Sequence, residues 1–250
     1  MNLHLKIRNV MLEKKSNLCV SLDYTYCQKI LDVLELIQDY VVMIKIHCDI
    51  IRDFNFDFIH QLVSICERKN IFILEDRKFA DIGHIFKQQF YQGFYRIQSW
   101  CHIITMHSLL GSGPIHQFRD CKRENQAILL IAQLSNQGNL IDSNYVNQSI
   151  KLAQENPEEV LGFICQNDNN PNHTNTHFLN FTPGVNRHQS NDSKDQRYVT
   201  PQKAIENGAD IIIVGRGITQ FQNEVLIEEC KIYQNLAWQA YAERNKITEI

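Results

Sequence analysis

Residues 71–83 read IFILEDRKFADIG and join a short apolar run to five charged side chains within seven positions. The apolar part predicts a buried strand that emerges into a loop. Packing alone does not place so many charges at the end of a strand. Asp76 and Lys78 are two positions apart, so on an extended chain they point to the same side. With Asp81 they predict an alternating acid–base–acid array, formed within the chain or across a subunit boundary.

Similar apolar runs recur along the chain, with helix-like segments between them. Each run is continuous rather than alternating, which is typical of strands that are covered on both faces in a parallel sheet. The eight runs cover residues 18–22, 41–46, 71–74, 102–106, 127–134, 160–164, 177–181 and 211–214.

The segments between these runs predict helices. Residues 26–39 and 58–67 carry apolar side chains at helical spacing, and residues 221–244 form a long C-terminal helical region. Thr200 has the character of an N-cap for a further helix over residues 201–207, which begins with a proline.

Eight β–α units in a chain of 250 residues fit a (β/α)₈ barrel, with a doubly wound open sheet as the alternative. No domain boundary is visible, so residues 1–250 are interpreted as one barrel domain. Two polar, Asn-rich segments, residues 167–176 and 186–197, lack periodicity and predict long loops. Loops of this length in a compact domain often act as lids, and residues 186–197 are the lid candidate.

The composition limits the partners of the protein. The net charge is −3, from 25 basic and 28 acidic side chains, so there is no basic excess to hold nucleic acid or an anionic membrane. No signal peptide is expected at the N-terminus, and no apolar run is long enough to span a membrane. The eight cysteines lack metal-ligand spacing and are interpreted as reduced thiols. We therefore expect a cytoplasmic protein that binds neither nucleic acid nor membrane.

Polar side chains follow nearly every apolar run. In a barrel the carboxyl ends of all strands meet at one end, where the active sites of this fold are built. The fold is therefore expected to bring one set of polar residues together: Asp23, Lys45, His47, Asp49, Asp76, Lys78, Thr105, His107, Gln133, Ser135, Gln166, Pro183, Gly215 and Arg216.

Lys45 lies inside an apolar run, where desolvation of its ammonium is costly without a partner. Asp23 and Asp76 end the two flanking strands and are the predicted partners.

The segment Gly215-Arg216-Gly217 is the best phosphate candidate. Its glycines let the backbone approach an anion, and Arg216 offers a forked donor. His47 and His107 also stand at strand ends, but no spacing in the sequence is typical of a metal site, so no metal is expected.

Five segments of the chain resemble the orotidine 5′-phosphate decarboxylase family, in the branch found in fungi and animals. Residues 75–83 match the signature of that family throughout, and residues 45–50 resemble its Lys-x-His-x-Asp-Ile segment. The resemblance covers nearly the whole chain in the same order, and its other segments are residues 17–23, 181–185 and 210–218.

The resemblance implies a barrel homodimer with two sites at the subunit interface. It implies conversion of orotidine 5′-monophosphate to uridine 5′-monophosphate and carbon dioxide, the last step of de novo pyrimidine synthesis. It implies that neither a metal nor an organic cofactor is used. The extent of the match implies a stand-alone decarboxylase, without the phosphoribosyltransferase domain that is fused to it in animals.

The resemblance also assigns roles to matching positions of this sequence. It implies that Asp23 and Lys45 hold the ribose hydroxyls, and that Lys45 also pairs with Asp76, which sits against the substrate carboxylate. It implies that Lys78 donates the proton to ring carbon C6, and that Asp81 belongs to the neighbouring subunit's site. The other substrate-binding positions that it implies are His47, Pro183, Ser135 at the pyrimidine ring, and Gln196, Tyr198, Gly215 and Arg216 around the phosphate.

The implied chemistry agrees with these residue types. Loss of carbon dioxide from C6 leaves an in-plane carbanion that the ring π system cannot delocalise. Stabilisation must then be electrostatic, from a fixed cation beside C6 in a dry pocket. Lys78 supplies that charge and then the proton, while Asp76 and Asp81 keep it ionised and oriented. Strand alternation leaves Glu75 and Arg77 with outward-facing or structural roles.

The chain departs from the family at His84 and Ile85, which replace the usual Asn-Thr pair, and Ile85 cannot make the hydroxyl contact to the ribose across the dimer. These changes touch binding rather than the acid–base array, so an active enzyme is expected. Three alternatives remain. They are a magnesium-dependent phosphosugar decarboxylase of the same barrel group, a catalytically silent nucleotide-binding barrel, and a Schiff-base aldolase that uses Lys45 or Lys78.

Overall fold

The computed structural model describes residues 2–166, 178–188 and 198–247. Within this part of the chain, eight parallel strands close into a barrel in sequence order, because β8 pairs with β1 as well as with β7. This closure confirms the predicted (β/α)₈ fold and excludes the open sheet. The strands are β1 (Leu18–Ser21), β2 (Met43–Ile46), β3 (Phe72–Phe79), β4 (Ile103–His107), β5 (Ala127–Ile131), β6 (Val160–Ile164), β7 (Leu179–Thr182) and β8 (Ile211–Val214).

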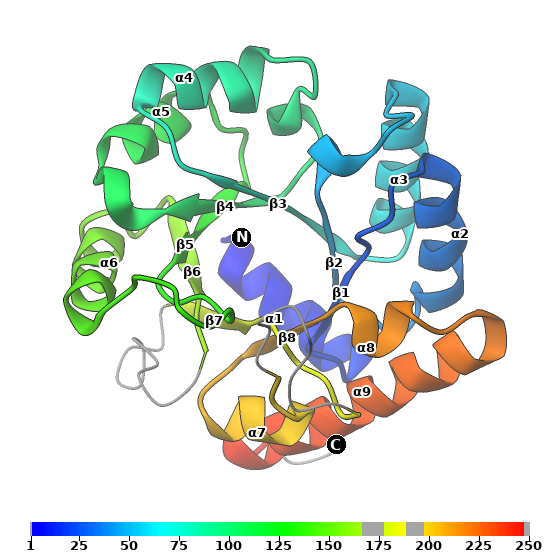
Figure 1. The fold of residues 1–250 in the computed structure, drawn as a ribbon. Coiled ribbons are helices and arrows are strands. Elements are labelled where there is room, and N and C mark those ends of the chain that lie inside the picture. The colour runs from blue at the N-terminus through cyan, green and yellow to red at the C-terminus, as the bar shows by residue number, and fades with distance from the viewer. Residues whose placement is uncertain (1, 167–177, 189–197, 248–250) are drawn as a thin grey trace.

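Helices surround the barrel in Figure 1, while α1 crosses it at one end. The predicted cap of α7 is confirmed, since the Thr200 side chain accepts the N–H of Lys203. The helices are α1 (Leu3–Lys14), α2 (Cys27–Ile37), α3 (Phe56–Arg68), α4 (Gly83–Lys87), α5 (Gly113–Cys121), α6 (Ser143–Glu155), α7 (Pro201–Glu206), α8 (Arg216–Thr219) and α9 (Asn223–Arg244). Short turns of helix occur at η1 (Cys48–Ile50), η2 (Gln88–Gln92), η3 (Ile97–Ser99) and η4 (Ser108–Leu110).

The strands lie between the barrel interior and the ring of helices, and this explains their composition. Every residue of β1, β2, β5, β6, β7 and β8 is buried. A strand that is covered on both faces gains free energy from apolar side chains at every position, which is why the runs are continuous rather than alternating.

Several predicted boundaries are wrong, and β3 continues five residues beyond the predicted end of its run at residue 74. The run over 127–134 is too long, because Ala132 and Gln133 both donate to the carbonyl of Ile164 and leave the regular ladder. The run over 177–181 is shifted, since β7 continues to Thr182 and residue 177 lies outside the described residues. The helix predicted over 221–244 begins at Asn223, where the chain has turned away from the separate α8.

Helix α1 was not predicted from the sequence. Apolar residues occur all around it, so no single apolar stripe marks it as a helix. Leu3, Ile7 and Met11 are buried, whereas Leu5 and Leu12 are exposed. Helix α1 ends only a few residues before β1, so the end of the barrel that it crosses in Figure 1 is the end where the strands begin. The carboxyl ends stay open at the other side of the barrel.

Strand β3 departs from regular pairing at its carboxyl end. Glu75 pairs with Ile104 of β4, and the next paired residue, Phe79, lies opposite Met106. The residues between them on β3 therefore face a single residue of β4, which is a bulge. Within the bulge Lys78 has a φ of 54°, a left-handed conformation that residues other than glycine seldom adopt.

Candidate active site

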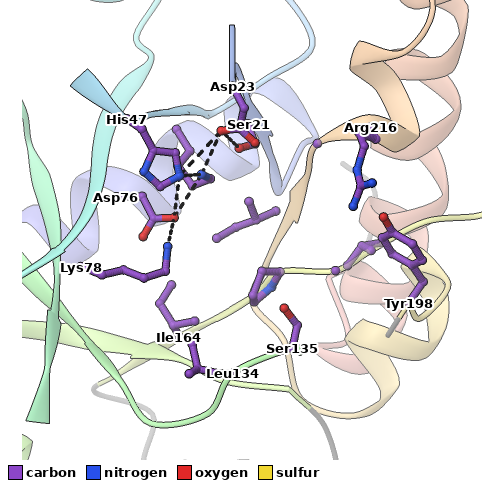
Figure 2. A pocket seen from close by; sticks show the side chains of 16 residues that line it. Ser21, Asp23, His47, Asp76, Lys78, Leu134, Ser135, Ile164, Tyr198 and Arg216 are labelled. Carbon is purple, nitrogen blue, oxygen red and sulfur yellow. Dashed lines mark hydrogen bonds and ion pairs between the residues drawn. The ribbon is translucent and has the colours of Figure 1, made fainter. Parts of the chain in front are cut away.

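A cavity opens at the carboxyl ends of the strands, and Figure 2 shows the side chains around it. Most of the site residues that were predicted from the sequence meet there, although they come from strands far apart in the chain. Those that line the cavity are Asp23, Lys45, His47, Asp76, Lys78, Ser135, Pro183, Tyr198, Gly215 and Arg216.

Lys45 is buried on β2 and lies between two carboxylates, as predicted. Its Nζ is 3.2 Å from Oδ1 of Asp23 and 3.1 Å from Oδ2 of Asp76. Burial lowers the pKa of Lys45, but Asp76 and Asp23 outweigh burial and hold this pKa above its usual value. Lys45 is therefore a permanent cation at the floor of the cavity.

Asp76 is the carboxylate that both lysines share. Its Oδ2 accepts from Nζ of Lys78 at 2.7 Å as well as from Lys45. Burial raises the pKa of Asp76, yet Lys45 and Lys78 outweigh burial, so this pKa lies well below its usual value. Asp76 is thus ionised at neutral pH although its side chain is only 9% exposed.

Lys78 meets Asp76 by a different geometry from the one predicted. Simple alternation along an extended chain was expected to place both side chains on one face. Instead, the left-handed backbone at Lys78 turns its side chain back toward Asp76 within the bulge. The Lys78 side chain is 35% exposed, because its end faces the open cavity. Buried groups therefore hold Asp76, and the ammonium of Lys78 faces the cavity.

His47 completes the inner end of the cavity. Its Nε2 lies 2.8 Å from Nζ of Lys45. Burial and then Lys45 lower the pKa of His47, so the ring is neutral near pH 7. Since the ammonium of Lys45 has only donors, Nε2 accepts this hydrogen bond. His47 thus satisfies Lys45 without adding charge.

Two hydroxyl groups at this end have contacts in the site that were not predicted from the sequence. Ser21 Oγ donates to Oδ1 of Asp23 at 2.7 Å. Burial raises the pKa of Asp23, but Lys45 and this hydrogen bond from Ser21 outweigh burial and lower the pKa. Thr105 Oγ1 donates to Oδ1 of Asp76 at 2.8 Å. The position of Ser21, two residues before Asp23 on one strand, was an available signal. Thr105 was noted only as a strand-end residue.

Glu75 and Arg77 point away from the cavity, which confirms their predicted outward orientation. Glu75 is fully buried behind β3, where its carboxyl oxygens lie 3.1 and 3.3 Å from the backbone N of Cys48. Burial raises the pKa of Glu75 to about 8. Arg77 instead lies 3.0 Å from a carboxylate oxygen of Asp49.

The opposite end of the cavity carries Arg216 and Tyr198, as Figure 2 shows. The Arg216 guanidinium lies over the Tyr198 ring, 5.9 Å from its centroid. Gly215 lines the cavity beside them, while Gly217 is required by packing, since a Cβ there would clash with the Tyr233 hydroxyl. The predicted phosphate residue Gln196 and most of the predicted lid over 186–197 lie outside the described residues.

Asp81 is not brought to Lys78 of its own chain. It follows β3, it does not line the cavity, and its Oδ1 accepts the N–H of Ile82 at 2.8 Å. Ile82 is 62% exposed beside it, and Ile50, Ile85 and Leu109 are further exposed apolar side chains after β2, β3 and β4.

The arrangement suits a reaction in which negative charge develops on a ligand atom beside Lys78. Asp23, Lys45, Asp76 and Lys78 alternate in sign and fix one another, so an anion in the cavity meets a cation that is already oriented. Arg216, at the other end, can bind a second anionic group. Ser135, with Leu134 and Ile164, lies between these ends.

Among residues 2–166, 178–188 and 198–247, no group of three or more His, Cys, Asp or Glu side chains is arranged to hold a metal ion. None of the helices in this part of the chain has both the length and the apolar character needed to cross a membrane.

Comparison with known proteins gives consistent matches. The family model described as orotidine 5′-phosphate decarboxylase / HUMPS family matches residues 16–227. The orotidine 5′-phosphate decarboxylase of Pichia kudriavzevii is 36% identical over 96% of this chain and 94% of its own length. The uridine 5′-monophosphate synthase of Bos taurus is 35% identical over 96% of this chain but 49% of its own length.

The fold also matches a solved structure. The orotidine 5′-monophosphate decarboxylase of Methanocaldococcus jannaschii, in complex with the inhibitor BMP, superimposes with a TM-score of 0.69. The match covers 89% of this chain and 98% of that one, at 18% sequence identity. At this level of identity the match supports the fold only.

Proposed function

The chain belongs to the orotidine 5′-phosphate decarboxylase / HUMPS family, and from this premise we propose that it converts orotidine 5′-monophosphate to uridine 5′-monophosphate and carbon dioxide. This would be the last step of de novo pyrimidine synthesis. The observation that carries the proposal is Lys78, whose Nζ is held 2.7 Å from a buried carboxylate and faces the cavity.

The proposed reaction needs a cation more than it needs an acid or a base. Carbon dioxide leaves C6 of the pyrimidine as a neutral molecule, and the electron pair of the broken bond stays on C6 in the ring plane. No conjugation is open to that pair, so a fixed positive charge beside C6 must stabilise it. Lys78 supplies this charge and then donates its proton to C6, which completes uridine 5′-monophosphate. No organic cofactor takes part in this proposal.

Asp76 plays two parts in the proposal. It orients the Lys78 ammonium before the substrate binds, since the carboxylate and the ammonium are in direct contact. It also lies where the substrate carboxylate would approach, so loss of carbon dioxide relieves a repulsion between two anions. Lys45, with Asp23, would bind the ribose hydroxyls while its contact with Asp76 fixes that carboxylate.

The phosphate would bind at the far end of the cavity. Arg216 supplies a forked donor, Tyr198 and Gly215 lie beside it, and we assign Gln196 to the same group by resemblance. Ser135 would bind the pyrimidine ring, and Pro183 and His47 would shape the pocket around the nucleotide. Binding energy at the phosphate can then be used to orient C6 against Lys78.

Decarboxylation can be followed by the loss of orotidine 5′-monophosphate absorbance, with the Lys78→Ala variant beside the wild type. We expect this variant to lose activity by a factor on the order of 10⁵ or more, because charge stabilisation and proton donation both disappear. It should still bind uridine 5′-monophosphate.

Lys69→Ala is the matched control, because Lys69 also contacts an aspartate, Asp39, at 2.9 Å but lies on the surface away from the cavity. This control should retain wild-type turnover. A wild-type protein that binds uridine 5′-monophosphate but does not turn over the substrate would exclude the proposed function. Activity that a chelator abolishes would favour the magnesium-dependent phosphosugar decarboxylases instead.

We also propose that the enzyme is a homodimer in which Asp81 completes the partner's site. Asp81 does not line the cavity of its own chain, and the segments that follow β2, β3 and β4 carry exposed apolar side chains, among them its neighbour Ile82. An exposed apolar surface next to an incomplete site is a suitable place for a second copy of the chain.

Mixing two inactive variants tests this arrangement. Lys78→Ala and Asp81→Ala would each disable both sites of their own homodimer. In a mixed dimer one site carries both changes and the other carries neither, so mixing and reassociation should restore about a quarter of the wild-type activity. If Asp81 instead serves its own chain, the mixture stays inactive.

A further inference from the structure

The bulge in β3 leaves Thr105 alone opposite three residues. Glu75 pairs with Ile104 and Phe79 with Met106, so Asp76, Arg77 and Lys78 all face Thr105 of β4. A bulge interrupts the regular exchange of backbone hydrogen bonds between two strands. The backbone N–H of Lys78 must therefore find another acceptor, because a buried N–H without one is costly.

The Thr105 side chain fills that role. Its Oγ1 accepts the N–H of Lys78 at 3.0 Å and donates to Oδ1 of Asp76 at 2.8 Å. The hydroxyl has one proton, so the direction of the two bonds is fixed, and Thr105 is fully buried away from competing water. One hydroxyl thus binds the main chain of Lys78 and the carboxylate of Asp76 at the same time.

The two oxygens of Asp76 have different partners as a result. Oδ1 is held by Thr105, which leaves Oδ2 to face Nζ of Lys78 at 2.7 Å and Nζ of Lys45 at 3.1 Å. Rotation of the carboxylate would break the bond to Thr105 and both ion pairs together. The same hydroxyl keeps the Lys78 backbone in the left-handed conformation that turns its side chain toward Asp76.

We propose that Thr105 is a positioning residue for decarboxylation, one that acts by locking the Asp76 carboxylate and the Lys78 backbone in a single geometry. This inference rests on the proposed function, because it assigns Thr105 a role through the reacting lysine. Thr105 does not line the cavity, so its effect should fall on the chemical step rather than on nucleotide binding.

The test replaces Thr105 with valine, which has the same shape without the hydroxyl, and with serine, which keeps the hydroxyl. The measurements are kcat with orotidine 5′-monophosphate, Kd for uridine 5′-monophosphate, and Tm. A displacement of about 1 Å at a reacting group costs on the order of 10²-fold in rate, and we expect this loss of kcat in Thr105→Val. The Kd should change by less than about threefold, and Thr105→Ser should recover kcat to within about fivefold of the wild type.

Thr182→Val is the matched control, because Thr182 is another buried threonine on a barrel strand and does not line the cavity. Its kcat should stay close to the wild-type value. An equal loss in this control would contradict the proposal, as would an unchanged kcat in Thr105→Val or a failure of serine to rescue. If Thr105→Val does not fold, Thr105→Ala carries the same expectation. Absence of turnover in the wild type would refute the proposed function itself, a result separate from any of these.

Discussion

The two faces of β3 carry neighbouring carboxyl groups whose pKa values are shifted in opposite directions. Glu75 and Asp76 are consecutive, and both are buried. Burial raises the pKa of Glu75 to about 8, whereas at Asp76 the lysines outweigh burial and the pKa lies well below its usual value. At neutral pH Asp76, on the face toward the cavity, is therefore ionised, and Glu75, on the opposite face, is largely protonated.

The difference comes from partners rather than from depth. Asp76 contacts two ammonium groups, while Glu75 accepts a hydrogen bond from the backbone N–H of Cys48 and has the negative charges of Asp49 and Asp76 near it. A buried acid stays ionised only where a cation offsets the loss of water. The charge of the site is thus made locally, in a protein whose net charge is only −3.

The largest expected contrast comes from neutralising each carboxyl in turn. Asp76→Asn removes the partner of Lys78, and we expect kcat/KM to fall by about 10³-fold. Glu75→Gln keeps an acceptor for Cys48, and kcat/KM should fall by less than about threefold. Steady-state kinetics of both variants measure the contrast. Similar losses in the two variants would show that the faces of β3 are not functionally distinct.

A second change would make Asp76 more like Glu75. Lys45→Met removes one of the two cations that lower the pKa of Asp76, so this pKa should rise while burial continues to act. Activity should fall by about 10²-fold at neutral pH. Because protonated Asp76 no longer holds Lys78, kcat/KM should also decrease further as the pH is lowered. A pH profile with the wild-type shape would contradict the assignment.

The neutral state of Glu75 predicts how stability depends on pH. Its folded pKa of about 8 lies above the ordinary value of 4.5, so the folded protein keeps a proton that the unfolded chain releases. This stabilisation is complete below about pH 4.5 and is lost as the pH rises to about 8. Between about pH 5 and about pH 8, Tm should therefore fall by roughly 10 °C more in the wild type than in Glu75→Gln. Parallel Tm curves for the two proteins would refute a neutral Glu75.

The smallest effect is expected for the ion pair on the outer face. Arg77 and Asp49 are 3.0 Å apart, close to the 2.7 Å of Lys78 and Asp76, but both side chains are partly exposed. Water and mobile ions weaken such a pair, so Asp49→Asn should lower the free energy of unfolding by less than about 1 kcal/mol. Urea denaturation measures this change. A loss several times larger would mean that Asp49 has a role beyond this pair.

Much of this contrast was predictable from the sequence, because parallel strands bring their carboxyl ends together. Lys45 lies near the carboxyl end of one apolar run, Asp23 and Asp76 follow the runs on either side of it, and their ion pairs result from that placement. The bulge was not predictable, since alternation assumes an extended chain through Lys78. Without the bulge Thr105 is an ordinary strand residue, and nothing in its neighbours marks its hydroxyl as important. Gln196 lies outside the described residues, so its assignment stays a prediction.

The left-handed backbone of Lys78 has a consequence for how such a protein evolves. A side chain in that conformation costs about 1 kcal/mol or more, and glycine would remove most of the cost. Loss of the lysine would relieve this strain, but it would also leave the buried carboxylate of Asp76 with one cation fewer. A barrel that loses this lysine therefore gains stability only if Asp76 is replaced at the same time, so the two positions should change together in evolution.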